Sequence, residues 1–125
     1  MKLSKRLEIA LKSDITKMKV AIGMGVSYST FIRYLTKTPE KFLSDIGKTA
    51  LIAETGIPES ELFEFEIKID FYYVSNGEQE KGDETHTIKS GSIQEAVNKA
   101  FEAYEDMSAI PFAAYYNKEK YTKTK

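Results

Sequence analysis

The sequence contains no cysteine and only one histidine, and these absences remove several classes of functional site. Without cysteine, the chain forms no disulfide and offers no thiolate to a metal ion. The single His86 argues against a histidine-based metal centre and against a serine–histidine catalytic machine, and we expect it to be an ordinary strand residue. The sequence therefore predicts no metal, no cofactor and no catalytic residue, and we expect that the protein is not an enzyme.

Long apolar runs are also missing. No stretch approaches the ~20 apolar residues of a membrane-spanning helix. The opening residues, MKLSKRLEIALKS, are charged throughout and lack the apolar core of a signal peptide. We therefore expect a cytoplasmic protein without a membrane partner. Its 125 residues suit one ordinary domain or two very small ones.

Charge is unevenly distributed along the chain. Residues 1–37 hold eight Lys and Arg residues against Glu8 and Asp14, a charge of +6. Because the net charge is −1, the other 88 residues carry −7. A basic segment on an otherwise acidic protein is typical of a face that meets a polyanion. Chance clustering of solvated lysines is the alternative interpretation.

The most informative segment is TKMKVAIGMGVSYSTFIRYL, residues 16–35. A phosphate-binding loop would need a Lys-Ser/Thr pair after its second glycine, and this segment has none. A tight helix–turn–helix explains the pattern better. Gly25 supplies the left-handed residue that ends one helix, and Ser27 caps the next. The small Ala21 permits close approach of the helices, and Val26 fills the space between them.

The rest of the first half follows the spacing of amphipathic helices. We expect five helices: residues 3–11, a second beginning at its N-cap Thr16 and ending at Gly25, residues 28–36, a continuous helix from Pro39 to Gly56, and a short turn over 58–63. Met18 and Met24 are predicted to fill the core.

The second half changes to strand patterns at residue 64. Residues 64–74 alternate between apolar and polar side chains, so Glu64, Glu66 and Asp70 are read as a solvated strand face. A polar turn, SNGEQEKGDE, leads to a return strand over 85–89. Ser92 and Glu95 form a capping box for a helix. A third strand over 109–116 would lie at an edge because it contains proline.

These patterns predict an α+β protein: an N-terminal five-helix helix-turn-helix domain over residues 1–63, a small ββα(β) module over 64–117 and a flexible tail over 118–125. The module has an aromatic face that must be covered, either by its helix or by a second copy of the chain. We therefore hypothesise that residues 64–117 form a homodimer. The residues of this face are Phe65, Phe71, Tyr73, Phe101, Tyr104 and Phe112.

Residues 3–63 resemble the DNA-binding domain of phage-repressor-type regulators, the Cro-like or XRE helix-turn-helix family. GVSYST and the tail FLSDIGKTALIAETGIPESELFE carry the resemblance. It implies a regulator that reads the major groove of double-stranded DNA with the helix 28–36, usually as a two-fold dimer. The implied base-reading residues are Tyr28, Ser29, Thr30 and Arg33. The implied phosphate contacts are Thr16, Lys17, Lys19, Lys37 and Lys41.

Other interpretations stay open. Arg33 can instead pair with an acid, and Tyr28 can pack on its own helix. The domain can also be a protein-interaction module that no longer binds DNA, which the acidic balance, Gly23 and Ile32 favour. A third possibility is an antitoxin-like regulator that reads DNA and holds a partner with its C-terminal half.

Overall fold

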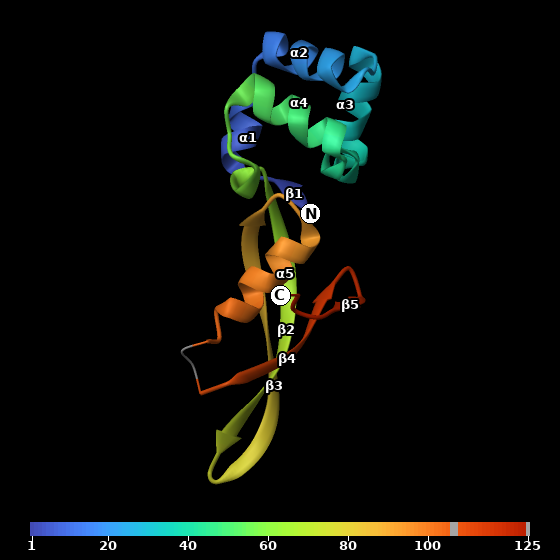
Figure 1. Cartoon of the computed structure of the whole chain (residues 1–125). Coiled ribbons are helices and arrows are strands. Elements are labelled where there is room, and N and C mark those ends of the chain that lie inside the picture. Colours follow the sequence, from blue (N-terminus) through green and yellow to red (C-terminus); the bar gives the residue numbers. More distant parts are fainter. Residues whose placement is uncertain (106–107, 125) are drawn as a thin grey trace. The chain divides into compact units, whose positions relative to one another are not determined.

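The computed structural model describes residues 1–105 and 108–124 and shows an α+β protein of helices and antiparallel strands (Figure 1). The chain divides into two compact units. The first unit is Met1–Glu64, and the second begins at Phe65.

The first unit is mainly helical. Its elements are β1 (Lys2–Leu3), α1 (Lys5–Ala10), α2 (Asp14–Met24), α3 (Tyr28–Lys37), the 3-10 helix η1 (Pro39–Leu43), α4 (Asp45–Thr55) and the 3-10 helix η2 (Glu59–Glu61). Leu3, expected in the first helix, lies instead in β1 and pairs with Phe63 at the start of β2 (Phe63–Ser75).

Serine begins each of the four α-helices of this unit. In every case the side-chain oxygen accepts a hydrogen bond from the backbone N–H three residues later, which satisfies an amide that the helix leaves free. The four serines are Ser4, Ser13, Ser27 and Ser44. The prediction of Thr16 as a cap is wrong, because the Thr16 N–H already donates to Ser13 Oγ at 3.3 Å.

The predicted continuous helix from Pro39 to Gly56 is broken at Ser44. Ser44 is extended, with φ −65° and ψ 156°, and its side chain caps α4 through the Gly47 N–H. Gly47 permits this sharp junction. A Cβ atom there would lie 2.9 Å from the carbonyl oxygen of Phe42, closer than real Cβ contacts allow.

The core of the first unit centres on aromatic and aliphatic side chains that are fully buried, including Phe31, Phe42 and Leu51. The rings of Phe31 and Phe42 meet edge to face, with centroids 5.6 Å apart. Helix α2 packs closely on α4, and a Cβ atom on Gly23 would lie 3.1 Å from the Ala50 Cβ. This close approach leaves little room for a side chain at position 23.

The second unit is a sheet with one helix. Its elements are most of β2, then β3 (Glu78–Ser90), α5 (Ile93–Glu102), β4 (Ile110–Tyr116) and β5 (Glu119–Tyr121), and the strand order is β3-β2-β4-β5. The prediction of a long polar turn between β2 and β3 is wrong. Only Asn76 and Gly77 make it, at φ 53° and 80°, because two residues of positive φ suit a two-residue hairpin.

One face of this sheet forms the core with α5, which packs against β3 and β4 (Figure 1). Phe65, Ile67 and Ile69 are fully buried, as their alternation predicted. Ser92 caps α5 by accepting from the Glu95 N–H, as the capping box predicted.

The C-terminal segment differs from the predicted flexible tail. Strand β5 pairs antiparallel with β4, with Ala114 opposite Tyr121. The Thr122 carbonyl also accepts a hydrogen bond from Gln94 on α5 at 2.9 Å. These contacts tie the segment to both the sheet and the helix.

Candidate nucleic-acid interface

The turn between α2 and α3 is built by backbone hydrogen bonds. Gly25 is left-handed, with φ 72°, and its N–H donates to the Ile22 carbonyl at 3.0 Å. The Val26 N–H donates to the Ala21 carbonyl at 3.1 Å. This pair of bonds is the Schellman arrangement that ends helices at glycine. The predicted role of Gly25 is confirmed, and only three residues separate the end of α2 from the start of α3.

Three hydroxyl groups gather at the N-terminus of α3. Ser27 Oγ accepts from the Thr30 N–H at 3.2 Å, donates to Thr30 Oγ1 at 2.9 Å and lies 3.3 Å from Ser29 Oγ. Thr30 is half-buried, whereas Ser29 is exposed. Thr30 therefore holds the start of the helix in place, and Ser29 is the hydroxyl that faces solvent.

The exposed face of α3 carries Tyr28, Ser29, Arg33 and Lys37. The guanidinium of Arg33 lies 5.9 Å from the Tyr34 ring centroid, and Arg33 forms no ion pair with any residue that the structure describes. Its five N–H donors are available to an acceptor from outside the chain. Tyr28 packs partly on its own helix, as its alternative interpretation expected. Its ring stacks on Phe31 with centroids 6.4 Å apart.

The predicted phosphate contacts fall into two groups. Lys19, Lys37 and Lys41 are exposed and have no ion-pair partner within residues 1–105 and 108–124. Lys17 differs, because its Nζ lies 3.3 Å from Asp14 and its side chain is only 18% exposed. The hydrogen bond to the Asp14 carboxylate is the main cause that raises the pKa of Lys17 above its ordinary value. Thr16 is half-buried beside this pair.

Helix α2 exposes a different surface, which we call the α2 stripe: Ile15, Met18 and Ile22. Each of these side chains is more than half exposed, so the prediction of Met18 as core is wrong. Their spacing of three and four residues was the sequence signal that could have identified one apolar helix face. Ile32 on α3, one of the residues that favoured an interaction module, is half-buried.

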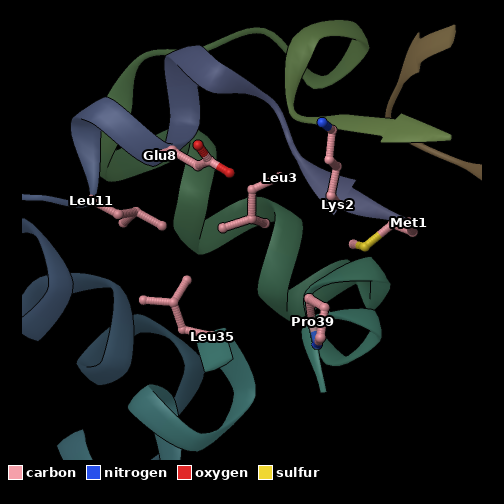
Figure 2. A pocket seen from close by; sticks show the side chains of 7 residues that line it. All are labelled: Met1, Lys2, Leu3, Glu8, Leu11, Leu35 and Pro39. Carbon is pink, nitrogen blue, oxygen red and sulfur yellow. The ribbon is translucent and has the colours of Figure 1, made fainter. Parts of the chain in front are cut away.

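A hollow of about 280 Å³ lies elsewhere in the first unit, between β1, α1 and the end of α3 (Figure 2). Leucine side chains from three elements surround it, and none of the predicted site residues lines it. Its lining residues are Met1, Lys2, Leu3, Glu8, Leu11, Leu35 and Pro39. The volume is small for a ligand site, and the walls are mostly apolar.

The second unit holds a titratable cluster that the sequence did not predict. His86 Nε2 lies 2.7 Å from the Tyr104 hydroxyl, which donates to Glu84 at 3.0 Å. Burial, with a smaller effect from Glu84, raises the pKa of Tyr104 well above its ordinary value. Among the described residues, no group of three or more His, Asp or Glu side chains is placed to hold a metal ion.

Every helix in the described part of the chain is too short or too polar to cross a lipid bilayer. Comparison of the chain with protein-family models, with curated proteins and with solved structures finds no match. Function is therefore inferred from the geometry of the molecule.

Proposed function

We propose that the protein is a sequence-specific DNA-binding transcriptional regulator of phage or mobile-element type. The observation that carries this proposal is the exposed face of α3, where Arg33 lacks an acidic partner among the described residues and the exposed Ser29 adds a hydroxyl. The helix follows α2 through a tight glycine turn and exposes one face, which is the arrangement that a recognition helix requires. The resemblance of residues 3–63 to the Cro-like family supports the same function.

The geometry divides the work among the site residues. Arg33 is the proposed base reader, since its planar fork matches the two acceptors of guanine in the major groove. Lys19, Lys37 and Lys41 are proposed to neutralise phosphates, which positions the protein without reading sequence. Thr30 and Thr16 are assigned to the N-terminal turns of α3 and α2 and not to a DNA contact. Lys17 would have to break its ion pair with Asp14 before it could contact a phosphate.

We further propose that the protein works in the cytoplasm as a dimer. Helix-turn-helix readers usually bind two half-sites about one helical turn apart, so the symmetry of the site mirrors that of the protein. The second unit is the proposed source of this symmetry.

Selection of bound fragments from a random duplex library, followed by two arginine variants, tests the proposal. Arg33→Ala should weaken binding to the selected sequence by about 10- to 100-fold and flatten the preference between sequences. Arg6→Ala is the matched control, because Arg6 lies on α1 and contacts Glu61 at 3.5 Å. Its sequence preference should equal that of the wild type. An equal loss in both variants would contradict the assigned role of Arg33.

The α2 stripe favours a second candidate, a protein-interaction module on the same scaffold. Three exposed apolar side chains on one helix face are unsuited to phosphate contact and suited to a protein partner. An antitoxin-like regulator would combine both surfaces. DNA binding that survives Ile22→Lys, with loss of a co-purifying protein, would support the combined function.

A further inference from the structure

The sheet of the second unit has one face that its helix covers and one that it does not. The Phe71 ring lies 5.5 Å from the ring of Tyr104, just past α5, so this aromatic face is closed within the chain. The sequence had left helix and second copy as alternatives for covering it, and the helix covers it. Phe112 does not belong to this face, because it stacks on Tyr72, whose neighbours Phe71 and Tyr73 point the other way.

The opposite face carries an exposed apolar cluster, which we call the outer patch: Tyr72, Val74, Ile110 and Phe112, with Lys81 beside them. Val74 is 71%, Ile110 65% and Phe112 37% exposed. The rings of Tyr72 and Phe112 stack at 4.3 Å, and Ile110 is the register partner of Tyr72. Lys81 Nζ lies 5.7 Å from the Tyr72 ring centroid.

A β-bulge aims Phe112 into this patch. Asp70 pairs with Ala113, but the next residue, Phe71, pairs with Pro111, so Phe112 is an extra residue in β4. Ala114 and Tyr116 are buried, and simple alternation from them would also turn Phe112 inward. Bulges re-aim side chains in this way. The fold thus places a large, partly exposed aromatic side chain on the face that α5 leaves uncovered.

We propose that the outer patch is the interface of a homodimer, in which two copies pack patch to patch across a two-fold axis. Tyr and Phe are enriched in the cores of protein interfaces, whereas a partner such as DNA would require a basic face.

The charges around the outer patch identify a second copy as the occupant. Lys68 and Asp70 form an ion pair at 3.8 Å on the same face, and Lys81 is followed two residues later by Asp83. This face therefore balances positive and negative groups. A balanced face matches its own copy, as an isologous interface requires, whereas a strongly acidic or basic partner would meet like charges on it. The dimer interface is inferred independently of the proposed function, and only the role of the dimer in DNA binding rests on that function.

Sedimentation equilibrium of the full chain without DNA tests the interface. The wild type should be a dimer at micromolar concentration. Phe112→Ser and Ile110→Ser should each raise the dimer Kd by roughly 30-fold or more, as expected for a central interface residue. Ile46→Ser is the matched control, an exposed isoleucine on α4 outside both the outer patch and the α2 stripe, and should leave the Kd unchanged. Far-UV circular dichroism checks folding, and if Phe112→Ser unfolds, Ile110→Ser and Val74→Ser decide.

Single-cysteine spin labels give a second readout, because the chain has no cysteine of its own. Pulsed electron spin resonance should find a shorter distance between copies labelled at Lys68→Cys, on the face of the outer patch, than between copies labelled at Glu102→Cys on α5, which covers the opposite face of the sheet. A strict monomer at high micromolar concentration overturns the proposal, as does a dimer that all three patch variants leave intact. A patch dimer that binds no DNA would refute only the proposed function, and a DNA-binding monomer would refute only this interface.

Discussion

Helix α3 of the first unit and the outer face of the sheet in the second unit expose surfaces of opposite chemistry. The first presents hydrogen-bond donors and cations on α3, with Ser29, Arg33 and Lys37 facing solvent. The second presents an apolar, aromatic patch on a sheet whose charges balance locally. Donors and unpaired cations suit a polyanion, whereas stacked rings suit another protein surface. In the two proposals above, one chain separates nucleic-acid contact from self-association.

The overall charge of the units follows the same division. The first unit has ten Lys and Arg residues against eight Asp and Glu, and the second has eight against eleven. The excess of acid in the second unit keeps it a poor site for DNA. Nucleic-acid contact is therefore expected from the first unit alone.

The largest expected effect contrasts two phenylalanines, one in each unit. Phe31→Ala removes a fully buried ring that contacts Phe42, and it should cost about 3–5 kcal/mol of unfolding free energy. Phe112→Ala removes a partly exposed ring and should cost the monomer less than about 1.5 kcal/mol. Urea denaturation of the two variants measures both values. Equal losses would mean that Phe112 is part of a core and would remove the contrast.

Two glycine substitutions test how closely the elements of the first unit pack. Gly47→Ala forces a Cβ against the Phe42 backbone and should destabilise by about 1–3 kcal/mol. Gly23→Ala meets only the Ala50 side chain, and the improved helix propensity of about 1 kcal/mol offsets that contact. Thermal melting should therefore separate them clearly. A larger loss at Gly23 would show that the packing of α2 on α4 cannot adjust.

Alkaline pH should lower the unfolding free energy of the second unit. The folded state raises the pKa of Tyr104, mainly by burial, so the folded protein keeps a proton that the unfolded chain releases near pH 10. Stability is complete below that pH and is lost as pH rises above it, by about 1 kcal/mol per pH unit for one group. Denaturation between pH 9 and 11 measures this loss. Tyr104→Phe should show a smaller slope, and an unchanged slope would assign the effect to other tyrosines such as Tyr73 or Tyr121, whose pKa values are also raised.

The smallest expected effect is the loss of a single phosphate contact, which is tested by substituting lysines in each of the two units. Lys19→Ala and Lys37→Ala should each weaken binding to all sequences and reduce the slope of log K against log salt by about 1. Lys120→Ala, an exposed lysine on β5, is the control and should leave the slope unchanged. Titrations at several salt concentrations give the slopes. A slope change in the control alone would move the DNA contact to the second unit.

Local signals predicted much of the fold. The Gly25 turn, the Ser27 and Ser92 caps and the alternation of β2 depend on residues close in sequence, and the structure contains all of them. The break at Ser44 could not be predicted from helix periodicity, because it depends on how closely Gly47 approaches the Phe42 backbone. Strand β3 was predicted only over 85–89 and begins at Glu78, because its first residues are polar and lack the apolar alternation of β2.

The candidate site was predicted only as a set of residue types. Sequence identified the exposed Ser29 and Arg33, but it could not tell that Thr30 bonds Ser27 or that Lys17 pairs with Asp14. These partners compete for the same groups that DNA would use. The bulge that turns Phe112 outward was also invisible, because it depends on the register between β2 and β4.

Fluorescence anisotropy of the full chain with a labelled random duplex at low salt tests the central claim most directly. The proposed function predicts binding at low salt that weakens linearly in log K as log salt increases. Absence of binding at the lowest salt concentration would contradict DNA recognition by α3 and would leave the protein-interaction module as the function.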